Sequence, residues 1–147
     1  GDSIAKVDFD ATGVHVGDAA QRQQAYLLRW EPTYFKGAYF TLQYIHFAKH
    51  YADFDPTSLT GKYKGQESFL LPRYWYMNIT GGYKLDLKNG IKMQFYGMVN
   101  NITNNLYITD GQHRKVDDNS MNTFNPKNLE VYVSSGLRFT TGVRISF

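Results

Sequence analysis

Apolar and polar side chains alternate along much of this chain with a period of two. The alternation is most regular between residues 74 and 87. Its odd positions carry Trp75, Met77, Ile79, Tyr83, Leu85 and Leu87, and its even positions carry Tyr74, Tyr76, Asn78, Thr80, Lys84 and Asp86. Successive side chains of a β-strand point to opposite faces of a sheet, so the pattern predicts a strand whose two faces meet different surroundings.

Five further segments favour strands, namely residues 4–11, 21–35, 38–51, 91–100 and 137–147, with a short extra strand expected at Leu129–Val133. Tight turns are expected at Lys36-Gly37 and at Lys88-Asn89-Gly90, where the Asn-Gly pair is a strong hairpin signal. The other connectors, residues 13–20, 53–72 and 104–134, are long.

Long and short connectors therefore alternate along the chain. Successive antiparallel strands place alternate connectors at opposite edges of a sheet, so we expect the long loops at one edge. The tight turns and the carboxyl terminus should then lie at the other. We predict an all-β protein, an antiparallel meander of about six or more long strands. Strands of about ten residues or more exceed the usual five or six and suit a tilted membrane crossing.

The last strand carries the most specific pattern in the chain. From residue 137 the odd positions are mostly apolar and the even positions are polar or small. The final eight residues read polar, any, Gly, any, any, apolar, any, aromatic. This order resembles the closing-strand signal of bacterial outer-membrane β-barrels, which their assembly machinery reads. Gly142, Ile145 and Phe147 carry the resemblance, and the alternative is an ordinary last strand of a soluble sandwich.

Composition narrows these possibilities. A chain of 147 residues suggests one domain, residues 1–147, in which Gly1 could be the scar of a cleaved tag. Aromatic residues make up 16%, with 12 Tyr, 10 Phe and 2 Trp. Tyr suits a boundary between oil and water, although an aromatic-rich sandwich would share this composition. A mean hydropathy of −0.47 and the lack of a long apolar run argue against a transmembrane helix but not against membrane-crossing strands.

Neither the distribution of charge nor the residue motifs indicate a catalytic site. The net charge is +3 with scattered basic residues, which makes nucleic acid a weak candidate partner. The sequence has no Cys, no nucleophile elbow and no phosphate-binding glycine loop, so we expect neither an enzyme nor a cofactor. His46 and His50 would lie about 13 Å apart along a strand, too far to share a metal ion. Two pairs of loop carboxylates could in principle bind calcium, but we expect them only to keep their exposed loops hydrated. These pairs are Asp53 with Asp55 and Asp117 with Asp118.

Three segments together resemble the C-terminal end of the barrel of TonB-dependent outer-membrane receptors. The first is Leu71-Pro72-Arg73-Tyr74-Trp75, opening a strand that ends in Gly81-Gly82-Tyr83-Lys84-Leu85. The second is residues 97–107, Gly-Met-Val-Asn-Asn-Ile-Thr-Asn-Asn-Leu-Tyr, and the third is residues 135–147. Residues 16–21 give a weaker match. The plug domain, the TonB-contacting box and many strands of a complete receptor have no counterpart here, so we expect a fragment or a domain that protects its sheet edges differently.

This resemblance implies a C-terminal segment of a transmembrane β-barrel in the cell outer membrane. The implied activity is uptake of a scarce nutrient, such as an iron chelate, cobalamin or an oligosaccharide. The implied partners are outer-membrane lipid, the barrel-assembly machinery and the TonB complex acting through the plug region. Residues 53–71 and 105–134 are the expected ligand-touching loops, and Tyr74-Trp75-Tyr76 and Tyr34-Phe35 are expected interfacial girdles. The alternative function is a small soluble or periplasmic β-barrel that binds an apolar ligand.

Overall fold

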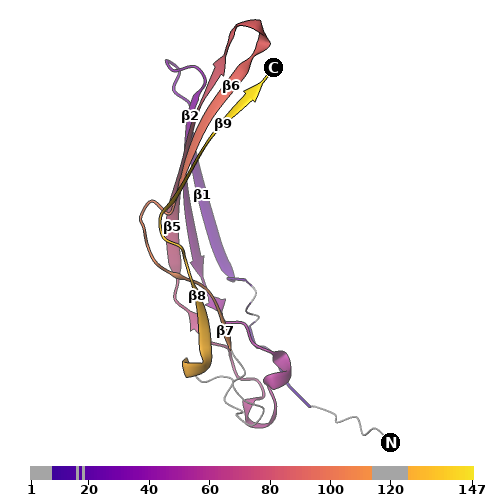
Figure 1. Cartoon of the computed structure of the whole chain (residues 1–147). Helices are drawn as coiled ribbons and strands as arrows, with labels where there is room; N and C mark the ends of the chain where they lie inside the picture. The colour runs from indigo at the N-terminus through magenta and orange to yellow at the C-terminus, as the bar shows by residue number, and fades with distance from the viewer. Residues whose placement is uncertain (1–7, 16, 18, 114–125) are drawn as a thin grey trace, which may run out of the picture. The chain divides into compact units, whose positions relative to one another are not determined.

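The computed structural model describes residues 8–15, 17, 19–113 and 126–147 (Figure 1). The fold is all-β, as predicted. The long strands form one antiparallel sheet of five, in which every strand pairs with the next long strand along the chain. In sheet order these strands are β1 (Arg22–Trp30), β2 (Ala38–Ala48), β5 (Tyr74–Asp86), β6 (Lys92–Asn100) and β9 (Arg138–Ser146).

A short turn connects β5 to β6 at Lys88-Asn89-Gly90, as predicted. Lys36-Gly37 also forms a turn, closed by a hydrogen bond from the Ala38 amide to the Phe35 carbonyl at 3.0 Å, but it is only the last part of a longer connector between β1 and β2, residues 31–37. Gly37 has a φ of 94°, and its carbonyl accepts a hydrogen bond from the Lys84 amide at 2.9 Å. Gly90 has a φ of 78° at the end of the 3₁₀ turn η3 (Lys88–Gly90). Side-chain-bearing residues rarely adopt such values, which explains the glycine at each of these two positions.

Two predicted strands are shorter in the structure. The segment predicted at 21–35 ends as β1 at Trp30, shortly before Pro32, whose ring nitrogen cannot donate a ladder hydrogen bond. The segment predicted at 38–51 is interrupted at Lys49, which has a φ of 56°. Beyond it, β3 (His50–Tyr51) belongs to a different sheet. Of the strand predicted at 4–11, residues 4–7 lie outside the described part, and Phe9 forms an isolated bridge with Thr60.

The chain divides into two compact units, each built from segments that are far apart in sequence. The sheet unit comprises residues 23–47, 74–106 and 135–147, and the loop unit comprises residues 1–22, 48–73 and 107–134. Each of the long connectors predicted around 53–72 and 104–134 therefore contributes most of its length to the loop unit.

The loop unit contains two small antiparallel ladders and three described 3₁₀ turns. β3 pairs with β4 (Leu70–Leu71), and β7 (Ile108–His113) pairs with β8 (Leu129–Val133). The turns are η1 (Pro56–Ser58), η2 (Gly61–Tyr63) and η4 (Pro126–Asn128). The predicted extra strand at Leu129–Val133 is confirmed. Its partner β7 was not predicted, because Asp110 and Gly111 are poor strand formers.

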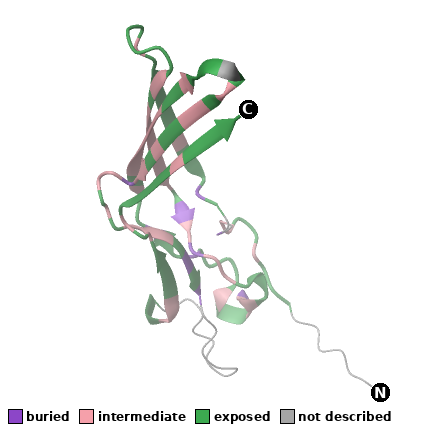
Figure 2. Ribbon diagram, turned by 45° about the horizontal axis from the view of Figure 1, so that its top comes forward, coloured by how far each residue is buried: buried purple, intermediate pink, exposed green. Residues whose placement is uncertain are grey.

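Burial differs sharply between the two units. The buried hydrophobic residues of the described chain are Ala20, Ala52, Leu59 and Leu71, and all of them belong to the loop unit. In the described sheet unit the one buried residue is polar, Asn101. Figure 2 shows exposed and half-buried residues along the long strands. The edge strand β9 is exposed at eight of its nine positions. Within the described residues, no helix has both the length and the apolar character needed to cross a membrane.

Candidate functional site

One face of the five-stranded sheet is apolar across its whole width. The register aligns Leu42, Ile79 and Val99 with Phe139 in one row, and Ala38, Tyr83 and Phe95 with Val143 in another. The odd positions of β5 share this face, as predicted, and Leu87 follows the end of the strand. We call this surface the apolar face; its large side chains are Tyr26, Leu28, Trp30, Phe40, Leu42, Tyr44, Trp75, Met77, Ile79, Tyr83, Leu85, Met93, Phe95, Val99, Phe139, Val143 and Ile145.

The apolar face is substantially exposed. Trp30 exposes 56% of its surface, Val143 55% and Phe139 76%. Burying a side chain of this size is worth about 1.5–3 kcal/mol relative to leaving it in water. A continuous exposed apolar surface of this size is typical of a protein–protein or membrane contact and not of a surface that faces water. This face is therefore the first candidate functional surface.

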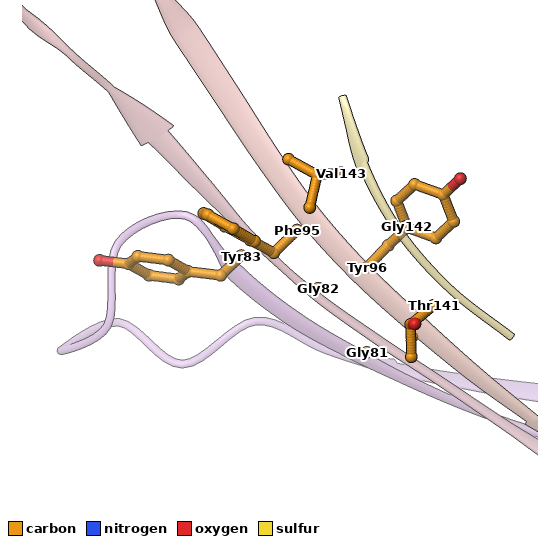
Figure 3. A pocket seen from close by; sticks show the side chains of 9 residues that line it. Gly81, Gly82, Tyr83, Phe95, Tyr96, Thr141, Gly142 and Val143 are labelled. Atoms are coloured by element: carbon orange, nitrogen blue, oxygen red, sulfur yellow. The ribbon is translucent and has the colours of Figure 1, made fainter. Parts of the chain in front are cut away.

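A shallow groove crosses the apolar face where small residues line up. Gly81, Gly97 and Thr141 are direct partners on three neighbouring strands. They form the floor of an open groove of about 480 Å³, bordered by the side chains of Tyr83 and Phe95 (Figure 3). The groove is part of the apolar face and brings together no acid, base or nucleophile suited to catalysis.

The opposite face of the sheet, which we call the polar face, carries tyrosine rings laid over glycines. The Tyr39 ring lies over Gly82, where an added Cβ would come within 2.5 Å of ring atoms. The Tyr96 ring lies over Gly142 in the same way, as Figure 3 shows. The two glycines thus make room for rings from the neighbouring strands and fix where those rings lie.

Amide side chains tie the end of β6 to the rest of the polar face. Asn78 donates to Gln43 at 3.0 Å and accepts from the Asn101 amide at 3.0 Å. Asn101, buried with a φ of 52°, donates through Nδ2 to the Asn105 carbonyl at 2.8 Å. Asn104, with a φ of 51°, accepts from the Leu137 amide at 3.0 Å. The asparagine run at 100–105 therefore holds a turn, a structural role that the run itself could have signalled.

The aromatic triplet predicted as a girdle is divided between the two faces. Trp75 contacts Tyr44 on the apolar face, with ring centroids 5.8 Å apart, whereas Tyr74 stacks on Phe47 of the polar face at 4.9 Å. At the turn end of the sheet, Tyr34 and Phe35 contact edge to face and expose 77% and 62% of their surface. Aromatic rings therefore lie at both ends of the sheet, while an interfacial role remains a prediction.

Each member of the predicted assembly signal has a distinct position. Gly142 lies beneath Tyr96 on the polar face, and Ile145 lies on the apolar face opposite Met93. Phe147 follows the last residue of β9 and is fully exposed. Contact with the Tyr96 ring thus explains why glycine occupies position 142. The Phe147 side chain, in contrast, is not buried by the described residues of the chain.

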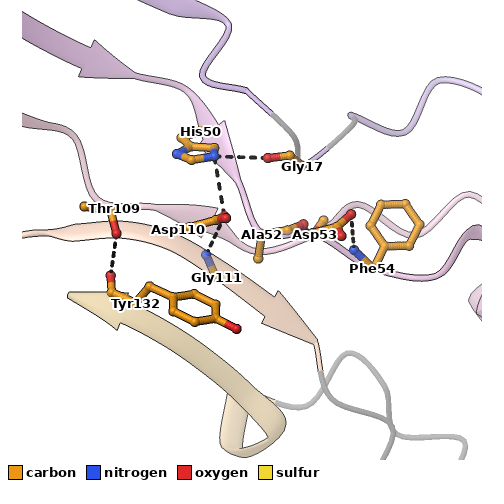
Figure 4. A network of polar contacts seen from close by, with 10 residues as sticks. Gly17, His50, Ala52, Asp53, Phe54, Thr109, Asp110, Gly111 and Tyr132 are labelled. Carbon is orange, nitrogen blue, oxygen red and sulfur yellow. Dashed lines mark hydrogen bonds and ion pairs between the residues drawn. The ribbon is translucent and has the colours of Figure 1, made fainter. Parts of the chain in front are cut away.

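Polar contacts hold the predicted ligand-touching loops together inside the loop unit (Figure 4). The backbone of Asp53 bonds on both sides to β7, donating to the Gly111 carbonyl at 2.7 Å and accepting from the His113 amide at 2.9 Å. Its carboxylate accepts from the Phe54 amide at 2.9 Å. Asp55 caps η1 by accepting from both the amide and the hydroxyl of Thr57. Asp53 and Asp55 thus serve local structure, and Asp117 and Asp118 lie outside the described residues.

The histidines occupy separate positions. His46 lies in β2, and His50 lies in β3, where its Nε2 is 3.0 Å from the Gly17 carbonyl and 3.7 Å from an Asp110 carboxylate oxygen. Across the described ranges, no group of three His, Cys, Asp or Glu residues could hold a metal ion.

His15 and Glu67 attach the described amino-terminal segment to residues 48–73 within the loop unit. The Glu67 carboxylate accepts from the His15 amide at 2.9 Å and contacts His15 Nδ1 at 2.5 Å, while the His15 ring stacks on Tyr51 at 4.3 Å. Burial acts to raise the pKa of Glu67, but hydrogen bonds from His15 and the Ser68 amide outweigh it, so the net pKa is below its usual value. The ionised Glu67 carboxylate is therefore the form that makes these contacts with His15, which we call the His15–Glu67 clasp.

Replacing Gly142 by Ala tests the ring-over-glycine packing. The new methyl group would overlap the Tyr96 ring, and we expect a destabilisation of about 1–3 kcal/mol. Gly97→Ala is the matched control, because its Cβ would meet nothing closer than 3.8 Å on the apolar face. Urea unfolding in detergent micelles measures both. A double-mutant cycle with Tyr96→Ala should show coupling between the sites, and additive effects would contradict the overlap.

Acidification should release the His15–Glu67 clasp. A carboxylate whose pKa is lowered by folding stabilises the folded state above its unfolded pKa of about 4.5, and that contribution is lost as the pH falls through the lower folded value. We expect the protection factor of the His15 amide, which is the ratio of its intrinsic to its observed exchange rate at each pH, to fall in this acidic range, and Glu67→Gln to lower it already at pH 7. Glu130→Gln, an exposed change of the same kind, should leave the protection factor unchanged. A His15 amide that exchanges equally slowly in the Glu67 variant would rule out the clasp.

Comparisons with protein-family models, with curated proteins and with solved structures found no match to this chain.

Proposed function

We propose that this chain forms part of the barrel wall and the outer loops of an outer-membrane receptor of the TonB-dependent type, which takes up a scarce nutrient. The observation that carries the proposal is the apolar face: it extends over all five strands, it is exposed, and the described sheet unit has no buried apolar side chain to serve as a core. Contact with lipid hydrocarbon would remove the apolar side chains of this face from water along its whole width.

Strand length supports the same proposal. The five strands of the sheet contain nine to thirteen residues. A strand tilted at about 45° needs about 9–11 residues to cross the hydrocarbon layer. Outward apolar and inward polar side chains also alternate along the strands of membrane barrels. In this proposal the apolar face contacts lipid and the polar face lines the lumen.

The shorter and longer connectors indicate which end of the sheet would face the periplasm and which would face the cell exterior. The shorter connectors after β1 and β5, residues 31–37 and 87–91, are at one end of the strands, and β2 and β6 continue into the long segments from their other ends. Outer-membrane barrels have short periplasmic turns and longer extracellular loops. We therefore place residues 53–71 and 105–134 outside the cell, where they would meet the nutrient. The TonB complex would act through a plug region, as in the family that the sequence resembles.

The second candidate, a small soluble barrel that binds an apolar ligand, has less support. It requires the long segment after β6 to supply a hairpin that closes the sheet. That segment does contain the β7–β8 hairpin, but this hairpin forms a separate sheet, and among the described residues β1 and β9 each pair on one side only. Solubility of the chain as a monomer in plain buffer would favour this candidate.

Arginine placed on alternate faces of β5 tests the membrane assignment. Ile79→Arg puts a charge in the middle of the apolar face, where we expect a cost of about 2–4 kcal/mol in a bilayer. Thr80→Arg, one residue further on the polar face, is the matched control and should cost little. Unfolding titrations in lipid bilayers measure both costs, and equal costs would contradict the assignment of faces.

Replacing the terminal aromatic tests the assembly signal. Phe147 is fully exposed, so Phe147→Ala should leave the stability of the assembled protein unchanged. We nevertheless expect less of the variant in the outer membrane of a Gram-negative host, relative to total protein. Phe139→Ala, a change of the same kind at an exposed position on the apolar face, controls for loss of an aromatic ring. Normal outer-membrane levels of the Phe147 variant would show that the terminus is an ordinary strand end.

A further inference from the structure

The turn end of the polar face contains a pocket whose walls are positively charged. Residues of β1, β2 and β5 and of the turn between β1 and β2 line a pocket of about 310 Å³. Its charged residues are Arg29, Lys36, Lys84 and Glu31, which leave a net charge of +2. Tyr39 lies at the same pocket.

The arginine is fixed in place by two contacts. Its Nε donates to the Glu31 carboxylate at 2.7 Å, and its guanidinium lies over the Tyr39 ring, 4.6 Å from the ring centre. Tyr39 is itself fixed over Gly82, and its hydroxyl accepts a hydrogen bond from Gln94 at 3.3 Å. The Glu31 contact engages Nε, and the terminal guanidinium nitrogens carry further N–H donors.

Both lysines line the pocket, and a backbone contact holds their segments together. The Lys84 amide donates to the carbonyl of Gly37, the residue after Lys36, at 2.9 Å. A side chain at position 37 would overlap the Lys84 carbonyl, so the close approach depends on glycine. In the described part of the chain, neither lysine has an acidic side chain within ion-pairing distance.

We propose that this pocket binds a phosphate group of a soluble small molecule. Glu31 offsets one of the three cationic charges, and the remaining net charge of +2 complements a phosphate, which carries about −2 at neutral pH. A guanidinium matches phosphate oxygens through paired N–H donors, and two ammonium groups add point charges. Because Arg29 and the turn are already held in position, less conformational entropy is lost when a ligand binds. The site does not depend on the membrane function proposed above.

The test is a titration of the full chain, in a non-ionic detergent, with inorganic phosphate at constant ionic strength. The Gly37 and Lys84 amide signals, followed by NMR, report on the pocket. We expect saturable shifts, with binding weakened about tenfold or more in each of Lys36→Gln and Lys84→Gln. Lys88→Gln, the same charge change at the other tight turn outside the pocket, should bind like the unaltered chain.

Two further measurements separate the possible sources of the anion. Acetate at the same concentrations should shift the signals less, because a monocarboxylate carries half the charge. Nanodiscs containing phosphatidylglycerol, without added phosphate, should leave the Gly37 signal where neutral lipid leaves it, because the proposed ligand is a soluble molecule and not a lipid headgroup. Signals that drift without saturating, or equal binding in all variants, would overturn the site. A phosphatidylglycerol response lost in Lys36→Gln would overturn the soluble-ligand assignment in favour of a lipid headgroup.

Discussion

The cost of exposing apolar side chains to water is the constraint on which the rest of this structure depends. In a soluble sheet one face packs on a core and the other meets water. Here the face rich in Leu, Ile, Val and aromatic residues has no layer over it among the described residues, and the buried apolar side chains are confined to the loop unit. A hydrocarbon environment reverses the sign of that cost. The length of the strands, the alternation along them and the polar character of the opposite face all agree with that environment.

The polar face is organised by fixed contacts rather than by a hydrophobic core. Tyr39 and Tyr96 lie over glycines of neighbouring strands, Asn78 and Asn101 link β2, β5 and the turn after β6, and Arg29 is clamped between Glu31 and Tyr39. These contacts limit how the side chains of this face can rearrange. They also concentrate positive charge at the turn end, which is the basis of the proposed phosphate site.

The sequence predicted the parts of the fold that depend on period-two alternation and on turn glycines. The order of the long strands, the two faces of β5 and the turns at Gly37 and Gly90 follow from those signals. The break at Lys49 does not, because a positive φ at a lysine has no local signature. The β7 strand was missed because its pairing with β8 and with Asp53 compensates for Asp110 and Gly111. The charged pocket was missed because its residues come from three strands and a turn whose proximity depends on register.

The absence of Cys from the sequence allows the central claim to be tested directly. Single cysteines placed at successive positions of β5 from 75 to 85, leaving out Gly82 because the Tyr39 ring lies over it, can carry a nitroxide spin label in a lipid bilayer. We predict that odd positions are accessible to oxygen, which concentrates in hydrocarbon, and that even positions are accessible to a water-soluble nickel reagent, with a period of two. Odd and even positions that respond alike, or odd positions more accessible to the nickel reagent, would contradict the claim that the apolar face of this sheet contacts lipid.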